Sequence, residues 1–212
     1  RLTETDFAAF TSEDAKHVMK LLEKSQYSDW TKITCKKIFK QLMRQFKIKE
    51  EVYNWITCNR PPNKLKKEDL LTPEEIRQLI TSAPNNMWKA LISMMAESGC
   101  RPGEALNLTI GNIMVNSDHI KVYVAGKMAR SSGERPLFLF KTYDLMKAWL
   151  QEHPAKNNPD APLWVTMSTR SPLTLCMLNI FFHRISQRAG ITKRCYPYLL
   201  RHCKGTEVYI KY

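Results

Sequence analysis

The segment that most constrains the fold is NRPPNKLKKEDLL at residues 59–71. Two adjacent prolines and a run of charges are typical of an exposed connection between domains rather than of a helix interior or a central strand. Directly after it, Thr72-Pro73-Glu74-Glu75 combines an N-cap threonine, a proline in the first turn and a glutamate that completes a capping box. We therefore predict a first domain over residues 1–60, a linker over 61–71 and a second domain over 72–212.

Helical spacing of apolar residues dominates the first domain. Ser12 is expected to cap a helix whose apolar face contains Ala15, Val18, Met19 and Leu22. A second helix is expected from about Thr31, and its apolar face would contain Cys35, Phe39, Leu42 and Phe46. The first domain is therefore predicted to be a small helical domain.

The second domain mixes two periodicities. Apolar residues keep the helical spacing up to Gly99, a natural helix end, and a new helix is expected at Pro102. Residues 119–127, HIKVYVAGK, alternate as a half-buried strand does, and residues 135–140, RPLFLF, would form its antiparallel partner. Further helices are expected around 145–150 and 175–189. The predicted fold class is mostly α with a small antiparallel sheet (α+β).

The charge of the chain points to a polyanionic partner. The formal net charge is +13, of which residues 1–69 carry +5 and residues 70–212 carry +8. Lysine and arginine bind phosphates and release their counterions, so nucleic acid is the favoured partner. In the second helix a basic stripe at helical spacing could follow a DNA backbone, although such a stripe is often only a solvated face. It consists of Lys36, Lys40, Arg44 and Lys47.

Other compositional features exclude several classes of protein. The six cysteines form no C-x-x-C pair and lie far apart, and the five histidines show no metal-ligand spacing, so neither a disulfide framework nor a metal site is predicted. No apolar run reaches the length of a membrane span, and the first residues do not resemble a signal peptide. We expect an intracellular, cytoplasmic protein that associates with DNA and not with a membrane.

Several cations stand at places where they could bind phosphate, although each alone is most simply a surface charge. Arg101 lies where one helix has just ended and the next begins, a position that favours anions. Lys127 lies at the mouth of the predicted hairpin, with Arg130 and Arg135 nearby, and Arg201 precedes His202 in a predicted helix.

Taken in order, SGCRPGEALNL, VAGK and YPYLLRH resemble the tyrosine recombinases, also called the phage integrase family, and in particular its archaeal and Xer-like members. The resemblance implies that Arg101 and Arg201 are the two catalytic arginines, that Glu104 supports Arg101, and that Lys127 is the hairpin lysine. It also implies that the first domain is the core-binding, DNA-binding domain of the family.

The same resemblance suggests a nucleophile. TEVYIKY resembles the TxxY segment of the family, which makes Tyr209 the attacking residue and Thr206 its usual neighbour. The family places a helix and a loop between the second arginine and this segment, whereas here only residues 203–205 intervene. Either the sequence omits a segment between Gly205 and Thr206 or the protein truly lacks it, and we favour omission.

A second departure from the family is Tyr198, which stands where a histidine is usual. A phenol can hydrogen-bond a phosphate oxygen, but with a pKa near 10 it is a poor general base at neutral pH. His202 is an alternative, although as the position next to Arg201 it points about 100° away from that arginine round the helix. The general base stays unassigned.

The implied reaction joins a tyrosine to the 3′ phosphate of double-stranded DNA and releases a 5′ hydroxyl. The 5′ hydroxyl of another strand later attacks this phosphotyrosyl link and reverses the step. Because bond energy is kept in the covalent intermediate, neither ATP, a metal nor another cofactor is expected. The resemblance implies a tetramer on two DNA sites, with a monomer as a possible free form. The alternatives are a non-catalytic, integrase-derived DNA-binding protein and a DNA-relaxing enzyme like the type IB topoisomerases.

Overall fold

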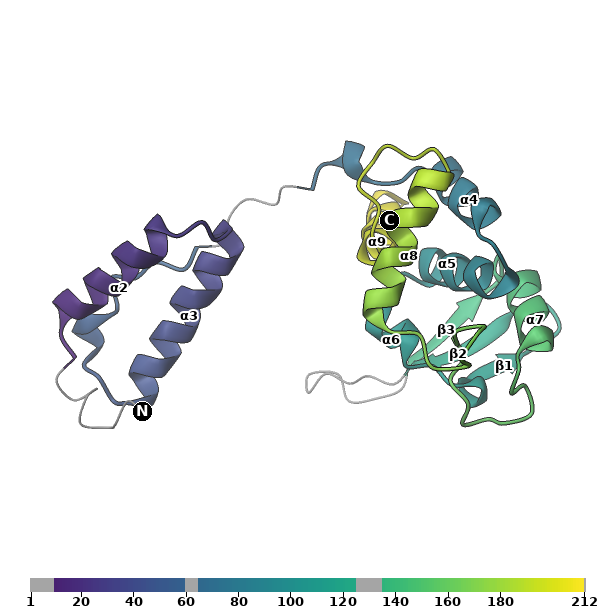
Figure 1. The fold of residues 1–212 in the computed structure, drawn as a ribbon, viewed down its shortest axis with the longest axis horizontal. Helices are drawn as coiled ribbons and strands as arrows, with labels where there is room; N and C mark the ends of the chain where they lie inside the picture. The colour runs from purple at the N-terminus through teal and green to yellow at the C-terminus, as the bar shows by residue number, and fades with distance from the viewer. Residues whose placement is uncertain (1–9, 60–64, 125–134, 212) are drawn as a thin grey trace. The chain divides into compact units, whose positions relative to one another are not determined.

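The computed structural model describes residues 10–59, 65–124 and 135–211, and the chain divides into two compact units, residues 1–64 and 65–212. Figure 1 shows both units with their helices and strands labelled. Each is described by itself below, as the first unit and the second unit. Residues 60–64, which belong to the predicted linker, lie outside the described residues.

The first unit contains two main helices, α2 (Ser12–Lys24) and α3 (Asp29–Gln45), followed by a short 3₁₀ turn, η1 (Glu50–Val52). The cap of α2 is Thr11 and not the expected Ser12: the Thr11 hydroxyl accepts from the Asp14 N–H, and the Asp14 carboxylate accepts from the Thr11 N–H. A threonine with an acidic residue three positions later makes the stronger cap, because two helix-end donors are satisfied reciprocally. Ser28 caps α3, so this helix begins two residues before the expected Thr31.

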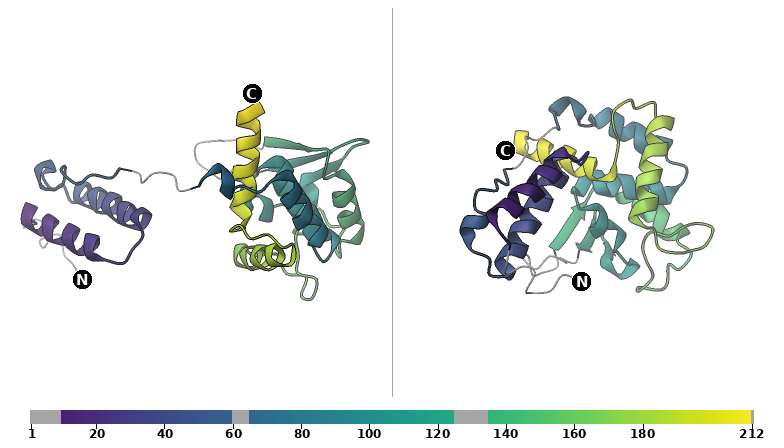
Figure 2. Two further views of the ribbon diagram at one scale, coloured as in Figure 1. Left: turned by 90° about the horizontal axis from the view of Figure 1, so that it is seen from above. Right: turned by 60° about the vertical axis from the view of Figure 1, so that its left-hand side comes forward.

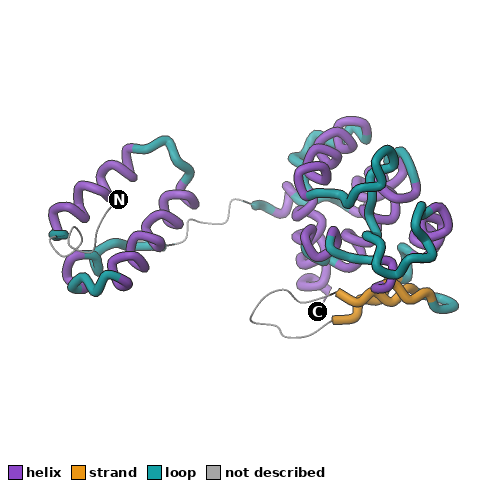
Figure 3. Tube along the Cα trace, turned by 60° about the horizontal axis from the view of Figure 1, so that its bottom comes forward, coloured by secondary structure: helices purple, strands orange, loops and turns teal. Residues whose placement is uncertain are grey.

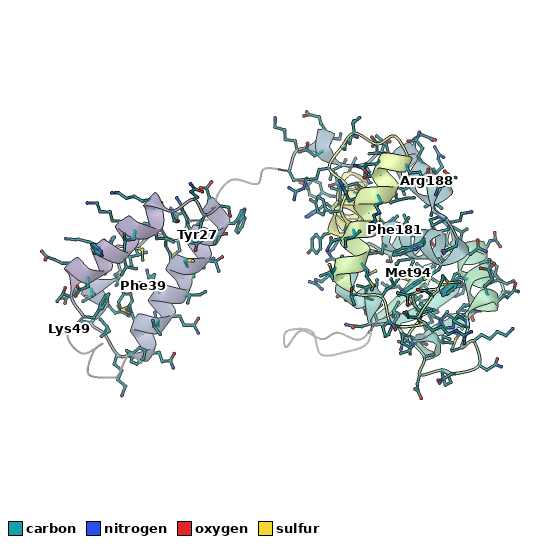
Figure 4. The ribbon with its side chains drawn as sticks, viewed as in Figure 1. Tyr27, Phe39, Lys49, Met94, Phe181 and Arg188 are labelled. Atoms are coloured by element: carbon teal, nitrogen blue, oxygen red, sulfur yellow. The ribbon has the colours of Figure 1, made fainter. Side chains whose placement is uncertain are left out.

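The core of the first unit lies between its two helices and the segment that follows them. Met19, Met43, Tyr53 and Ile56 are buried there. Figure 4 shows Phe39 pointing between α2 and α3, where its ring lies 5.9 Å from that of Phe10, centroid to centroid. The segment after η1 therefore completes this small core.

The end of the predicted linker belongs to the second unit. Leu65 and Leu70 pack against the second core, Leu71 is buried within it, and the 3₁₀ turn η2 (Lys67–Asp69) lies between them. Thr72 then caps the next helix, and its capping box with Glu75 is present as the sequence predicts. The described end of the linker is thus packed chain, which prolines and charges alone do not reveal.

Six helices build most of the second unit around α5. These are α4 (Pro73–Ser82), α5 (Asn86–Ser98), α6 (Pro102–Leu106), α7 (Tyr143–Glu152), α8 (Leu175–Arg188) and α9 (Pro197–Lys211), with the 3₁₀ turn η3 (Ile110–Asn112) after α6. Helix α5 is buried along most of its length and packs against α4, α7 and α9. Figure 2 shows α9 in yellow as one continuous helix whose last turns project from this unit. Helix α5 is the central element of the core.

The sheet has three antiparallel strands in the order β1 (Ile113–Val115), β2 (Ile120–Val124) and β3 (Arg135–Leu139). Its inner face is formed by alternate residues of β2, Ile120, Val122 and Val124, which are all buried. Figure 3 shows the strands in orange beside the helical layer. A mostly helical unit with one small sheet confirms the predicted α+β class, and the two predicted strands are both present. The sequence did not indicate β1, which is only three residues long.

The connection from the sheet to α7 is held by a carboxylate on α5. Glu97 accepts hydrogen bonds from the N–H groups of Phe140, Lys141 and Thr142, at 2.8, 2.9 and 2.9 Å, and from the Thr142 hydroxyl at 2.7 Å. The buried Thr142 hydroxyl also lies 2.9 Å from that of Ser93. Three backbone donors are thus satisfied by one side chain from another element.

Among the described residues, no helix combines the length and the apolar character that a membrane crossing needs. No group of three or more histidine, cysteine or acidic side chains is placed among them so as to hold a metal ion.

Candidate active site

The site is built at the corner between α5 and α6. Gly99 ends α5 with φ of 61°, in the left-handed region that a residue with a side chain rarely adopts. The turn allows Arg101 to stand at the start of α6 two residues later, with its side chain 42% exposed. Gly99, Arg101, Glu104 and Arg201 are together called the arginine corner below.

Glu104 holds the arginine corner together. One carboxylate oxygen accepts from the Arg101 guanidinium at 2.8 Å, and the other accepts from the Arg101 N–H at 2.8 Å and the Arg135 guanidinium at 2.6 Å. Burial alone raises the pKa of Glu104, but the hydrogen bonds from Arg101 and the charges of Arg135 and Arg101 outweigh it and lower the pKa below its ordinary value. Glu104 is therefore an ionised clamp on two arginines, with only 16% of its side chain exposed.

The second arginine reaches the same corner from α9. The Arg201 guanidinium donates to the Gly99 carbonyl oxygen at 2.6 Å. The side chain of Lys204, one turn along α9, covers Gly99 so closely that a Cβ on Gly99 would lie 3.0 Å from the Lys204 Cγ. Lys204 in turn pairs with Glu207 at 3.1 Å. Gly99 thus allows both the left-handed turn after α5 and the close approach of α9 to that turn.

Tyr198 and His202 complete the face of α9 that reaches the corner. Their rings are 5.1 Å apart in an edge-to-face arrangement. The hydrogen bond to Glu104 and its charge raise the pKa of Arg101, and Tyr198 raises it further to a smaller extent. Tyr198 is therefore a neighbour of the Arg101 guanidinium, and His202 is a neighbour of Tyr198.

Cys100 lies inside this constellation but cannot serve it as a thiolate. It is buried, and burial raises the pKa of its thiol despite an opposing hydrogen bond from Ser98. The chemical capacity of the corner therefore lies in its guanidinium groups. Two partly exposed guanidiniums on a fixed backbone can bind the non-bridging oxygens of one phosphodiester.

Tyr209 is not brought to the arginine corner. It lies on α9, eight residues after Arg201, which corresponds to about 12 Å along a helix axis. Its side chain is 86% exposed, and its neighbours Val208 and Ile210 are exposed as well. Helix α9 is continuous through Gly205 and Thr206, between which the resemblance suggests a missing segment. Packing does not require a glycine at position 205, because nothing lies within 4 Å of where its Cβ would be.

The predicted DNA contacts of the hairpin divide into two groups. Lys127 and Arg130 lie outside the described residues. Arg135 is at the start of β3, where it pairs with Glu104 and so belongs to the support of Arg101. Sequence reasoning missed this pairing because the two residues are 31 positions apart.

The predicted basic stripe of α3 is also divided. Lys36 forms an ion pair with Glu23 of α2 at 2.5 Å, and Lys40 donates to the Ile56 carbonyl oxygen at 3.2 Å. Arg44 and Lys47 are exposed, and Lys47 has a left-handed backbone with φ of 54° just after the helix. Two of the four stripe residues are therefore engaged within the first unit.

Comparison with known proteins agrees with this geometry. A family model described as the phage integrase family matches residues 69–211. No curated protein sequence matches the chain.

Solved structures show the same fold at low sequence identity. XerA recombinase is 20% identical, with a TM-score of 0.59 over 100% of this chain and 72% of that one. XerH site-specific recombinase bound to difH substrate is 21% identical, with a TM-score of 0.70 over 100% of this chain and 63% of that one. The Tn1549 transposon integrase in complex with circular intermediate DNA is 13% identical, with a TM-score of 0.66 over 96% and 74%. The chain thus spans between about three fifths and three quarters of the length of these structures.

Proposed function

The chain belongs to the phage integrase family, and from that premise we propose that it is a site-specific recombinase that cleaves and rejoins DNA through a 3′-phosphotyrosyl intermediate. One observation carries the proposal: Arg101 and Arg201, from helices 100 positions apart in sequence, meet at the turn around Gly99. A structural role alone would not require two partly exposed guanidiniums at one backbone corner.

In the proposed reaction the two arginines act on the phosphate. A tyrosine oxygen attacks phosphorus, the bond from phosphorus to the 5′ oxygen breaks, and negative charge gathers on the non-bridging oxygens. Arg101 and Arg201 would neutralise that charge through donors already fixed in place by Glu104 and the Gly99 carbonyl, so little reorganisation is needed during the reaction.

The neighbouring side chains would support this step. Glu104 and Arg135 hold Arg101, and Tyr198 with His202 lies beside it. We assign Tyr198 the role of a phosphate-oxygen donor, because a phenol hydroxyl can hydrogen-bond a phosphate oxygen. His202 is the better candidate to take the proton of the attacking tyrosine, since histidine is the side chain that most often acts as a general base.

Lys127 would protonate the departing 5′ oxygen, because an ammonium can give up a proton where a guanidinium does not. Lys127→Ala is then expected to slow cleavage of ordinary DNA. A substrate with sulfur in place of the bridging 5′ oxygen should restore the rate, because a thiolate leaves without a proton. An equal defect on both substrates would contradict the general-acid role.

Tyr209 is the attacking residue that the sequence favours. Because α9 is continuous, Tyr209 would act on a phosphate held by the arginine corner of a second molecule, which fits a tetramer assembled on two duplexes. A mixture of Arg101→Ala and Tyr209→Phe chains should then form adduct, while neither variant does so alone. If adduct never returns in the mixture, Tyr209 does not act in this way.

The deciding experiment is a nicked suicide duplex incubated with the protein and resolved on a denaturing gel. A covalent protein–DNA band is expected, and mass spectrometry should place the nucleotide on Tyr209 and not on Tyr212. Adduct on another tyrosine would leave the recombinase proposal standing and remove Tyr209 from it. The absence of any adduct would overturn the catalytic proposal.

A second candidate function is non-catalytic DNA binding, and the distance of Tyr209 from the arginine corner favours it. In that case residues 206–211 are only the last turns of α9, of which Thr206 and Ile210 line a hollow of about 280 Å³ together with Ile76 of α4. DNA binding without adduct would support this candidate. A relaxing enzyme like the type IB topoisomerases would give adduct and relax supercoils without exchanging strands.

A further inference from the structure

The outer face of the sheet points away from the helical layer beside which Figure 3 draws the strands. Because the inner face is formed by alternate residues of β2, the residues between them point outward. The register places Lys121 of β2 between Met114 of β1 and Phe138 of β3 on this outer side. The face, called the ring face below, consists of Met114, His119, Lys121, Tyr123, Phe138 and Phe140.

The aromatic rings of the ring face are open to solvent and close to one another. Phe138 and Phe140 are 50% and 59% exposed, and as alternate residues of an extended chain they stand about 7 Å apart. The His119 ring lies near both, at 5.7 Å from Phe138 and 5.5 Å from Phe140, centroid to centroid. Rings that serve only the core would be buried, and a contiguous exposed apolar patch marks a surface at which something binds.

The ring face is positively charged as well as aromatic. The Lys121 ammonium lies 4.8 Å from the centre of the Tyr123 ring and 5.9 Å from that of Phe138. None of the six residues of the face is acidic, and the adjacent Asp118 carboxylate is engaged with the His119 ring at 2.7 Å. A ligand on this face therefore meets flat π surfaces with an ammonium group among them.

We propose that the ring face is a stacking platform for the unpaired bases of single-stranded DNA. Every base has a flat surface that can stack on Phe138 or Phe140, and Lys121 would pair with a phosphate of the same strand. The charge decides the class of partner. An apolar protein surface would strip water from the Lys121 ammonium without compensation, whereas the phosphates of a nucleic acid neutralise it.

The platform goes beyond the proposed function. None of its residues belongs to the arginine corner, and no step of the proposed cleavage uses them. A duplex should not occupy it in the same way, because the flat surfaces of its bases are covered by their neighbours in the stack and become available only when a base is unstacked. Preference for a single strand over a duplex is therefore the property that the ring face should supply.

Phe138 offers a matched pair of variants. Phe138→Leu keeps an apolar side chain and removes the ring, whereas Phe138→Tyr keeps the ring. Binding of the intact chain to a fluorescent single strand and to the corresponding duplex is measured by anisotropy, with melting temperatures as the check on folding. Phe138→Leu should weaken single-strand binding by about tenfold, the effect of losing one stacked base, and should leave duplex binding unchanged. Phe138→Tyr should bind both ligands as the wild type does.

The contribution of the cation is tested by a salt series on the single strand. Each phosphate contact to a single strand contributes about 0.7 to the slope of log affinity against log salt. Lys121→Gln should reduce the slope by about that amount, and Lys121→Arg should retain the wild-type slope because the charge is kept. An unchanged slope in Lys121→Gln would remove the phosphate contact from the proposal.

Three results would overturn the platform: unchanged single-strand binding in Phe138→Leu, equal losses in Phe138→Leu and Phe138→Tyr, or equal losses for single strand and duplex. If Phe138→Leu instead abolished a dimer of the chain and left DNA binding intact, the ring face would be an interface between copies. None of these measurements depends on cleavage. A chain that prefers single strands through Phe138 but forms no adduct would refute the catalytic proposal and leave the platform standing.

Discussion

The two units hold their candidate phosphate-binding cations in opposite ways. In the second unit the guanidiniums of Arg101, Arg135 and Arg201 each donate to a protein oxygen at 2.8 Å or less. In the first unit Lys37 and Arg44 are exposed and have no carboxylate beside them in the hollow that they line. Donors that are already held in place suit a transition state, because they stabilise its developing charge without reorganising. Exposed side chains suit a polyanion that is recognised by its charge.

The strongest test of this comparison is removal of the fixed arginines. Arg101→Ala and Arg201→Ala should each slow cleavage by at least about a hundredfold, the usual cost of deleting a transition-state donor. Single-turnover cleavage and duplex affinity are measured on the same preparations. Affinity should change far less, as many other cations remain. Equal losses in both quantities would show that these arginines only anchor DNA.

A smaller effect is expected when the clamp is loosened and the arginines are kept. Arg135→Gln should slow cleavage by roughly tenfold, since a misplaced Arg101 loses part of its effect, and Arg135→Lys should recover most of the rate. Because the pKa of Glu104 is lowered, the clamp is fully present above about pH 4.3 and is lost as the pH falls through the lower native pKa. Cleavage rates of the Arg135→Gln and Arg135→Lys variants check the rescue, and wild-type rates over a pH series check the loss of the Glu104 contacts. A wild-type rate in Arg135→Gln would mean that Glu104 alone fixes Arg101.

The glycine at the arginine corner offers a matched pair for stability. Gly99 and Gly190 both have left-handed backbones, with φ of 61° and 70°, but only Gly99 has a side chain against it. Gly190→Ala should cost roughly 1–2 kcal/mol, the strain of the left-handed backbone alone. Gly99→Ala should cost more, because its Cβ would meet Lys204, and it should also slow cleavage by displacing α9. Thermal unfolding and cleavage assays compare the two, and equal melting temperatures would show that Lys204 moves aside freely.

The smallest expected effect concerns acid stability, and it belongs to the second unit. His153 is buried, its Nδ1 accepts from the Ala155 N–H at 3.1 Å, and burial lowers its pKa. The unfolded chain takes up a proton near pH 6.5 while native His153 stays neutral, so stability should fall as the pH drops below that value. Melting temperatures from pH 7 to pH 5 should decrease, and His153→Gln should weaken the decrease. If the melting temperature of the variant depended on pH as that of the wild type does, the pH dependence would have to come from other groups.

Local signals in the sequence predicted much of the fold. The capping box at Thr72, the helix end at Gly99 and the alternation of Ile120, Val122 and Val124 each act within a few residues, and all three are present. The proximity of Arg101 and Arg201 came from motif resemblance and could not follow from spacing. Contacts between distant residues were missed: Glu23 reaches Lys36 from another helix, and Arg135 reaches Glu104 from a strand.

The segment after Arg201 shows a different limit. A TxxY pattern has the same appearance whether it starts a new segment or continues a helix, because threonine, valine and tyrosine are all tolerated in helices. Gly205 lies inside α9, which runs on through Thr206 and Tyr209. The spacing of the motif alone therefore did not predict the helix that contains it.

Strand β3 is fastened to the helical layer at both of its ends. Arg135 pairs with Glu104 where the strand begins, and Glu97 accepts from the N–H groups that follow where it ends. Its register is therefore set by these two carboxylates as well as by β2. For protein engineering this means that changes to β3 should spare both Arg135 and Glu97, because losing either one would release one end of the strand while its pairing with β2 is kept.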